Sequence, residues 1–147
     1  MNLEEIINYT FNDETLLNRA LTRKAYALEQ RQKNQHVEDQ EVLRTLGDAV
    51  LKTILVDLLI NSGYSTRAEI TNRKKDLEKG TALAIMARDF GIGQYIKLGK
   101  GEIKQKAHEE ESVLAETLEA VVGAIYFDEG YNGTKEVVSG WFGNLSI

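Results

Sequence analysis

The chain has 147 residues, 42% of them hydrophobic and 28% charged, which is enough for one domain with a hydrophobic core and too short for two. It contains no cysteine, which excludes disulfides and thiolate zinc sites and permits a reducing cytoplasm. Its longest apolar run, residues 54–60, is interrupted by Asp57 and is far below the roughly 20 residues of a membrane span. We therefore expect a single domain over residues 1–147, in the cytoplasm and without a membrane partner.

The charge of the chain is acidic overall but unevenly distributed. The net charge of -5 and the sequence pI near 5.1 argue mildly against a protein that coats a polyanion by bulk electrostatics. Positive charge nevertheless concentrates at residues 73–75 and again among the lysines of residues 97–106. The alternative is that these are ordinary solvated side chains, since exposure is the default for lysine and arginine.

The first half of the chain is predicted to be helical, and no proline interrupts it. An Asn-Asp cap at residues 12–13 precedes a short amphipathic helix, and the polar residues 31–40 are predicted to form a loop or a frayed end. Apolar residues at helical spacing predict a central core helix over residues 41–60, which Asn-Ser-Gly at 61–63 ends. Residues 66–79, with alternating charges, indicate an exposed helix or hinge.

The second half continues the helical pattern, so the chain is predicted to be all-α. Residues 83–87 form a buried helical stripe, and the glycines of residues 91–101 mark turns. Ser112 is expected to cap a long apolar helix that runs to residues 128–130, and a last amphipathic helix is expected over residues 134–141.

Two acidic segments about seventy residues apart are the most informative feature of the chain. Glu41 and Asp48 share one helix face with Arg44 between them, and Glu116 and Glu119 share a face of the later helix. If these helices pack side by side, the four carboxylates can converge. An all-oxygen cluster of this kind selects Mg²⁺ or Mn²⁺, cations that serve phosphoryl chemistry.

Two glycines distinguish these segments from ordinary acidic helix faces. Glu pairs three residues apart are common on solvated helices, which is the alternative interpretation. However, Gly47 adjoins Asp48 inside an apolar helix, and Gly123 lies on the acidic face of the other, although each glycine costs about 1 kcal/mol relative to alanine. A close approach of the two backbones beside the acids would explain both.

At these residues the chain resembles the ribonuclease III family of double-stranded-RNA endonucleases. The family signature Asn-Glu-x-Leu-Glu-Phe-Leu-Gly-Asp-Ala/Ser-Val/Ile-Leu is similar to residues 40–51, QEVLRTLGDAVL. Residues 111–126, ESVLAETLEAVVGAIY, resemble the second acidic motif, where Asp commonly stands at the position of Glu116. The resemblance extends to residues 9–22 and 83–102, and so covers nearly the whole chain.

The resemblance implies a ribonuclease III endonuclease domain fold and a homodimer whose two active sites face one RNA duplex. Asp48 and Glu119 would be catalytic and the principal ligands of Mg²⁺, with Mn²⁺ possible. Glu116 would be a further ligand, and Glu41 an auxiliary acid near the site or the dimer interface. Metal-held water would cleave double-stranded or structured RNA to 5′-phosphate and 3′-hydroxyl ends. We take as RNA-binding candidates Arg73, Lys74, Lys75 and Lys100.

Two departures from the family pattern leave three hypotheses. Arg44 stands where members usually carry a metal-binding Glu, and we expect a stand-alone domain, without the RNA-binding domain that typical bacterial members carry downstream. The first hypothesis is a compact, metal-dependent endoribonuclease. The second is a degenerate relative that binds RNA or ribosome without cutting, in which Arg44 contacts a phosphate directly. The third is a helical interaction protein of another lineage that shares only the fold.

Overall fold

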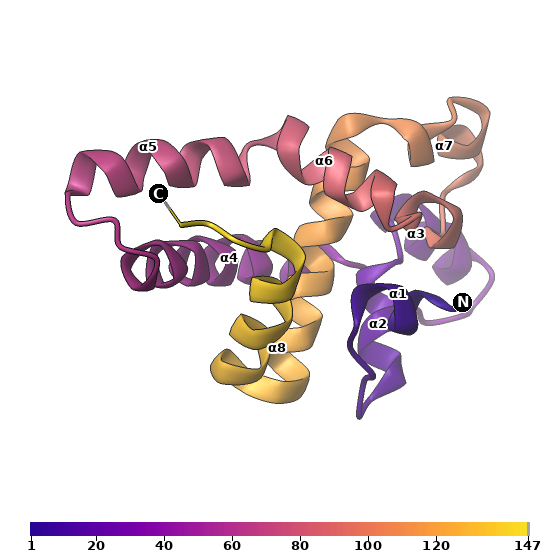
Figure 1. Ribbon diagram of the computed structural model, residues 1–147. Helices are drawn as coiled ribbons and strands as arrows, with labels where there is room; N and C mark the ends of the chain where they lie inside the picture. Colours follow the sequence, from indigo (N-terminus) through magenta and orange to yellow (C-terminus); the bar gives the residue numbers. More distant parts are fainter. Residues whose placement is uncertain (147) are drawn as a thin grey trace.

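The computed structural model describes residues 1–146, and the regular elements in this part of the chain are helices (Figure 1). The prediction of an all-α protein is therefore confirmed. A single isolated bridge joins Thr22 and Lys97. The elements, in chain order, are α1 (Leu3–Ile7), α2 (Glu14–Ala20), α3 (Lys24–Gln32), α4 (Glu41–Asn61), α5 (Arg67–Glu78), α6 (Gly80–Asp89), the 3-10 turn η1 (Ile92–Tyr95), α7 (Lys100–Lys104), the 3-10 turn η2 (Ala107–Glu109) and α8 (Glu111–Phe142).

Several of the predicted helix ends are confirmed by the caps that form them. The Asp13 side chain accepts a hydrogen bond from the Thr15 N–H at the start of α2. The core helix α4 ends at Asn61, and Gly63 follows with a left-handed φ of 102°, which a residue with a side chain rarely adopts. Helix α5, capped by Thr66, contains no buried residue and is the exposed helix that its charges predicted.

Other boundaries differ from the prediction. Helix α3 extends through Gln32, so the predicted loop is shorter than residues 31–40. Ser112 does not cap α8: the helix begins one residue earlier, and Glu110 occupies the cap position without a side-chain hydrogen bond. At its far end α8 continues to Phe142, interrupted by Gly130 with a φ of 84°, so the last helical segment follows Gly130 directly instead of beginning at Thr134.

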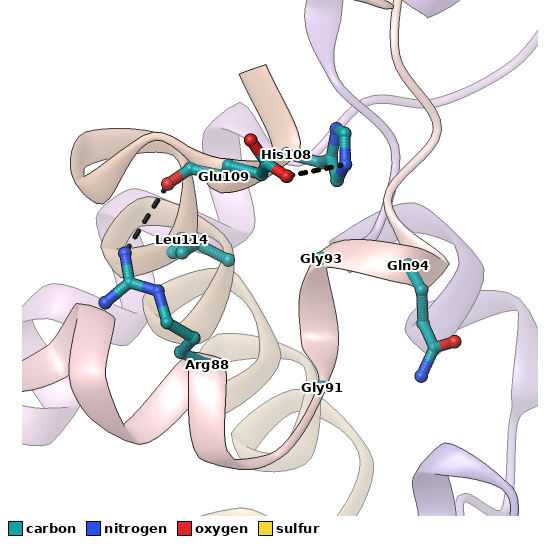
Figure 2. A pocket seen from close by; sticks show the side chains of 7 residues that line it. All are labelled: Arg88, Gly91, Gly93, Gln94, His108, Glu109 and Leu114. Carbon is teal, nitrogen blue, oxygen red and sulfur yellow. Dashed lines mark hydrogen bonds and ion pairs between the residues drawn. The ribbon is translucent and has the colours of Figure 1, made fainter. Parts of the chain in front are cut away.

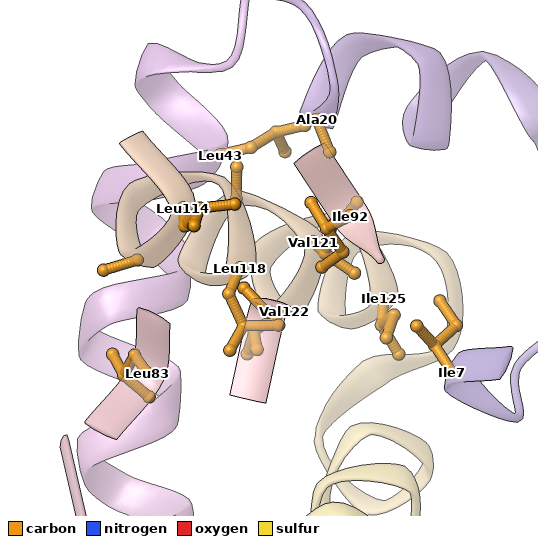
Figure 3. Packing of buried hydrophobic residues seen from close by; sticks show 14 of the residues in the cluster. Ile7, Ala20, Leu43, Leu83, Ile92, Leu114, Leu118, Val121, Val122 and Ile125 are labelled. Carbon is orange, nitrogen blue, oxygen red and sulfur yellow. The ribbon is translucent and has the colours of Figure 1, made fainter. Parts of the chain in front are cut away.

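The core forms where α4 packs against α8, the most extensive helix contact in the described chain. Leu43 and Ile54 of α4 and Leu118 and Ile125 of α8 are almost completely buried, and Figure 3 shows side chains from α1, α6 and η1 packing around them. Each such side chain stabilises the fold by about 1.5–3 kcal/mol relative to leaving it exposed. The two acidic segments are thus the two central core helices.

Two glycines set the distance between these helices. A Cβ atom added at Gly47 would lie 1.7 Å from the Glu119 backbone oxygen, and one at Gly123 would lie 2.1 Å from the Leu43 backbone oxygen. Carbon and oxygen atoms cannot approach so closely, so both positions require glycine while the backbones keep these positions. The predicted close approach is confirmed, and it places Asp48 of α4 beside Glu119 of α8.

The N-terminal segment is tied to α8 by polar contacts. The Tyr9 hydroxyl donates to the Asp128 carboxylate, which also accepts from the backbone N–H of Asn12 at 2.8 Å. The Trp141 indole donates to the Ile7 carbonyl oxygen at 2.7 Å. Within residues 1–146 no helix is both long and apolar enough to cross a membrane.

Candidate active site

Asp48 and Glu119 form a carboxylate pair at the contact of α4 and α8. Burial raises the pKa of Glu119 to about 8, and the hydrogen bond and negative charge of Asp48 add to this effect. The hydrogen bond from Glu119 lowers the pKa of Asp48, as does the Lys52 ammonium. The two opposite shifts favour a state in which Asp48 is ionised and Glu119 keeps the proton.

Two lysines lie around this pair. Lys52, one turn after Asp48 on α4, donates from Nζ to Asp48 Oδ1 at 2.7 Å. Lys74 of α5 lies 3.2 Å from Glu78 Oε1, and its positive charge also contributes to lowering the pKa of Asp48. The region around the carboxylate pair thus already holds positive charge from two helices.

A second polar group, here called the arginine cluster, consists of Arg23, Arg44, Glu41 and Glu116. Arg44 Nη1 lies 3.3 Å from Glu41 Oε2 and 3.2 Å from Glu116 Oε1. Arg23 Nη1 lies 3.0 Å from the same Glu116 oxygen. Burial would lower the pKa of Arg23, but its hydrogen bonds with Glu116 and Glu102 raise it overall. Glu116 is therefore neutralised by two guanidinium groups.

The structure divides the four predicted acids between these two groups. Asp48 and Glu119 lie together, whereas Glu41 and Glu116 lie with the arginines. Among residues 1–146, no group of three or more Asp, Glu or His side chains is placed to hold a metal ion, so the predicted convergence of four carboxylates is not observed. The physical reason is the guanidinium charge of Arg23 and Arg44, which attracts Glu116 and Glu41 to itself.

The four predicted RNA-binding residues do not form one cluster. Arg73, Lys74 and Lys75 lie on α5, whereas Lys100 begins α7, and Figure 1 shows α5 and α7 at opposite ends of the view with α6 between them. Lys75 and Lys100 are exposed, and Arg73 is half-buried. Lys74 is also half-buried and is held by Glu78. Their role in RNA binding stays a prediction.

Three charged residues near the acids were not singled out from the sequence. Lys52 follows Asp48 by four residues and Glu78 follows Lys74 by four, a spacing that places each pair on one helix face and could have indicated the ion pairs. Arg23 gave no such signal, because its partners Glu102 and Glu116 are far away in the sequence. Only the packing of α8 and α7 near α3 brings them together.

Two hollows of the surface lie away from the carboxylate pair. Figure 2 shows a cavity of about 390 Å³, and none of the predicted site residues lines it; the lining residues are Arg88, Gly91, Gly93, Gln94, His108, Glu109 and Leu114. A second cavity, of about 330 Å³, lies at the arginine cluster and is lined by Arg23, Arg44 and Glu41 among others. The carboxylate pair is instead a surface site between helices.

The all-helical fold, with two acidic helices packed through glycines, defines the class of protein. A profile of the family described as Ribonuclease-III-like matches residues 13–144. The chain therefore belongs to the ribonuclease-III-like family.

Individual relatives are similar over nearly the whole chain. Ribonuclease 3 from Pseudomonas fluorescens (strain SBW25) is 38% identical over 140 residues, which cover 95% of this chain and 57% of the relative. Ribonuclease 3 from Hahella chejuensis is 35% identical over 141 residues, with 95% and 58% covered. The chain thus spans a little more than half the length of the curated relatives it matches.

Solved structures support the same conclusion at the level of the fold. The nuclease domain of ribonuclease III from Campylobacter jejuni superposes with a TM-score of 0.86 at 26% identity, covering 99% of this chain and 97% of that one. That nuclease domain has structural flexibility in the region involved in dimer formation. A second structure of the same nuclease domain gives a TM-score of 0.82, with 95% and 90% covered. The predicted ribonuclease III endonuclease domain fold is confirmed.

Proposed function

We propose that this chain, as a single domain, is a divalent-metal-dependent endoribonuclease that cleaves double-stranded or structured RNA to 5′-phosphate and 3′-hydroxyl ends. The observation that carries the proposal is the carboxylate pair. Asp48 and Glu119 are brought together by a helix contact that only glycine at positions 47 and 123 permits. Two acidic side chains that share a hydrogen bond, with their pKa values shifted in opposite directions, are typical of a functional site.

The carboxylate pair fits a hard cation such as Mg²⁺ or Mn²⁺. Its donors are all oxygen, and a cationic group already lies on Asp48, where the Lys52 ammonium is 2.7 Å from Oδ1. Burial, and after it Asp48, raises the pKa of Glu119 to about 8, so a cation held beside it would favour its ionised form. We therefore assign Asp48 and Glu119 as the residues that hold the cation. When bound, it supplies an activated water and neutralises charge on the phosphate.

The side chains around the cation have separate roles in positioning water and binding the substrate phosphate. Ionised Asp48 accepts hydrogen bonds, so it can orient a water molecule toward a phosphorus atom. With a cation held there, the pKa of Glu119 would fall and its proton would pass to solvent. Lys52 and Lys74, with ammonium groups on two different helices, face the same region and can contact the phosphate oxygens of the substrate.

The substrate and the assembly are proposed on separate grounds. Duplex RNA hides its base edges in a deep groove and is read mostly by shape and by its phosphates, which agrees with contacts made by lysines. A homodimer is supported by exposed apolar side chains at the arginine cluster: Val42 is 62% exposed and Leu28 44% exposed, and the two hollows that they line share Glu41. Location in the cytoplasm stays a prediction that the absence of cysteine permits.

A cleavage assay tests the proposal directly. Purified protein is incubated with end-labelled duplex RNA and Mg²⁺ or Mn²⁺, and we expect discrete products with 5′-phosphate ends. Asp48→Asn keeps the size and hydrogen-bonding capacity of the side chain but removes its charge, so activity should fall at least about 100-fold. Wild type and Asp48→Asn cutting equally, or neither cutting at all, would exclude the enzyme.

The arginine cluster favours a second candidate function, binding of RNA without cleavage. Arg44 removes a carboxylate from the position where family members usually carry one, and its side chain is 37% exposed. If Arg44 binds a phosphate, Arg44→Glu should weaken RNA binding in a filter-binding titration. If cleavage is the function and Arg44 only competes with the cation, Arg44→Glu should strengthen metal affinity in calorimetry.

A further inference from the structure

Arg23, at the cap position of α3, is held both at its backbone and at its guanidinium group. Its backbone N–H donates to the Lys97 carbonyl oxygen at 3.0 Å. Its Nε donates to Glu102 of α7 at 3.1 Å, and its Nη1 donates to Gln40 Oε1 at 3.1 Å and to Glu116 Oε1 at 3.0 Å. The side chain is only 19% exposed. One planar and rigid fork thus joins the segments that begin α3, α4, α7 and α8.

Gln40, at the cap position of α4, is the buried partner of Arg23. It is 1% exposed, and its Nε2 donates to the Ala20 carbonyl oxygen at 2.8 Å and to Thr117 Oγ1 at 3.3 Å. Its amide oxygen accepts from Arg23, so both polar atoms of this buried side chain have partners. The bond to Thr117 links α4 directly to α8. A buried network whose groups are all satisfied specifies one arrangement of the elements it joins.

The glycine contact sets the distance between α4 and α8 but not their rotation or sliding. Gly47 and Gly123 meet the partner backbone without side chains, so nothing interlocks at that point. Polar contacts lie on both sides of it. The bond that Thr117 accepts lies before the glycines, and the bond of 2.9 Å from the Tyr131 hydroxyl to Asp57 lies after them. A rotation or slide of one helix against the other would strain these bonds.

The carboxylate pair depends on this register, because its own contacts constrain it weakly. Glu119 lies one turn after Glu116 on the same face of α8. The ammonium group on Asp48 belongs to Lys52, whose side chain is 45% exposed and flexible. A displacement of about 1 Å can cost about 100-fold in rate, even when its cause lies away from the reacting atoms. The groups that fix the two helices therefore matter for the chemistry without touching it.

We propose that Arg23 is a positioning residue for the carboxylate pair. It acts through Gln40 on α4 and through Glu116 on α8, and so fixes the register in which the two acids meet. Glu116 then serves as an anchor for the guanidinium group. The inference rests on the proposed function, since it concerns the same site.

Calorimetric titration with Mn²⁺ alone tests the assignment without RNA. Arg23→Lys keeps the positive charge and loses the fork. Arg19→Lys is the matched control, because Arg19 is 26% exposed and its Nε donates to a backbone oxygen, that of Asp39, at 3.2 Å. We expect Arg23→Lys to weaken Mn²⁺ binding by about 10-fold or more and Arg19→Lys by less than about 2-fold. Equal effects of the two changes would overturn the proposal.

A double variant tests whether Arg23 acts through its buried partner. Gln40→Met removes the amide oxygen that accepts from Arg23 and keeps the length of the side chain. It should weaken Mn²⁺ binding about as much as Arg23→Lys does. The two changes together should weaken it no more than either alone, because groups of one hydrogen-bond network are not additive. Additive losses would overturn the path through Gln40.

Steady-state cleavage of duplex RNA separates positioning from binding. Arg23→Lys should lower kcat by about 10-fold or more and change KM by less than about 2-fold, because the residue fixes the acids and does not contact the substrate. A raised KM with unchanged kcat would make Arg23 an RNA contact instead. A lowered melting temperature with unchanged kcat would make it a purely structural residue. Either result would overturn the proposal.

Carboxyl-carbon resonances report the contact of the two acids with neither metal nor RNA. With Asp and Glu labelled at the side-chain carboxyl carbon, the resonances of Asp48 and Glu119 at neutral pH should move in Arg23→Lys and stay in place in Arg19→Lys. Unmoved resonances in folded Arg23→Lys would overturn the inference even if RNA is cleaved. Moved resonances would support it even if the assay with Asp48→Asn excludes the enzyme, so the two proposals can fail separately.

Discussion

Asp48 and Asp57 lie on the same helix, and each accepts a hydrogen bond from a lysine, yet their surroundings differ. Asp57 is bound by Lys135 at 3.0 Å, by the Tyr131 hydroxyl at 2.9 Å and by the Asn61 amide at 3.0 Å. Asp48 has one lysine at 2.7 Å and is pressed against another carboxyl group, that of Glu119. The first carboxylate ties two helices together, whereas the second shares a hydrogen bond with a neighbouring acidic side chain.

The comparison shows that α4 contributes one aspartate to the stability of the fold and another to the candidate site. Around Asp57 every partner is a donor, so its negative charge stabilises the native state and ties α4 to the last segment of α8. Around Asp48 the nearest group from α8 is an acid, held there by the glycine contact. Removing charge should therefore weaken the protein at Asp57 and leave its stability almost unchanged at Asp48.

The largest effect is expected at Gly47, the glycine that permits the close contact of α4 and α8. Gly47→Ala places a Cβ 1.7 Å from the Glu119 backbone oxygen, and since backbone cannot yield as a side chain can, we expect a loss of about 3 kcal/mol or more in the free energy of unfolding. Urea denaturation measures this. Gly140→Ala is the matched control: it meets nothing within 4 Å and should stabilise by about 0.5–1 kcal/mol. Similar values for the two variants would show that the contact of α4 and α8 is looser than described.

The next effect is a direct comparison of the two aspartates. Asp57→Asn loses charge-assisted hydrogen bonds from Lys135 and Tyr131 and should cost about 1 kcal/mol of unfolding free energy, reduced by partial exposure. Asp48→Asn should change the free energy of unfolding by less than about 0.5 kcal/mol. The ion pair with Lys52 is lost, but the negative charge that raises the pKa of Glu119 is removed as well. RNA cleavage should follow the reverse order, with Asp57→Asn active. A stable Asp57→Asn together with an unstable Asp48→Asn would contradict the distinction.

The pH dependence provides a third contrast. The hydrogen bond from Lys135 and then that from Tyr131 lower the pKa of Asp57 below its ordinary value, so ionisation is favoured by folding. Its stabilisation is complete above the unfolded pKa of about 3.9 and is lost as the pH falls through the lower folded pKa. The difference in stability between wild type and Asp57→Asn should therefore be full at pH 7 and shrink at pH 3 and below. An undiminished difference at the lowest pH would assign the effect to packing instead.

The smallest effect is expected at the partner lysines. Lys52 is 45% exposed and Lys135 is 29% exposed. Lys52→Met should shift the unfolding free energy by no more than about 0.5 kcal/mol, and Lys135→Met should cost slightly more, up to about 1 kcal/mol. Thermal unfolding of both variants at low and high salt distinguishes the two ion pairs, because salt screens the more exposed pair more strongly. Equal losses would mean that Asp48 also serves the fold.

Much of the fold could be predicted from the chain because its signals are local. Helical spacing gave α4 and the buried stripe of α6, and Asp13 and Asn61-Ser62-Gly63 marked helix ends. The cap at Ser112 was wrong, because Glu110 occupies the cap position and the helix begins at Glu111. Which of two nearby residues occupies the N-cap position depends on the path of the backbone through the preceding turn η2. A local sequence pattern does not predict that path.

The sequence by itself determined which carboxylates stand beside glycine in the interior of apolar helices, and through them the family and the contact of α4 with α8. Only the tertiary structure decided how the charges pair. Arg23 meets Glu116 across a long stretch of chain and, with Arg44, neutralises it, and the return of α5 along α4 brings the Lys74 charge near enough to lower the pKa of Asp48. Helical periodicity fixes the face on which a side chain lies, but the partner across that face depends on how distant segments pack.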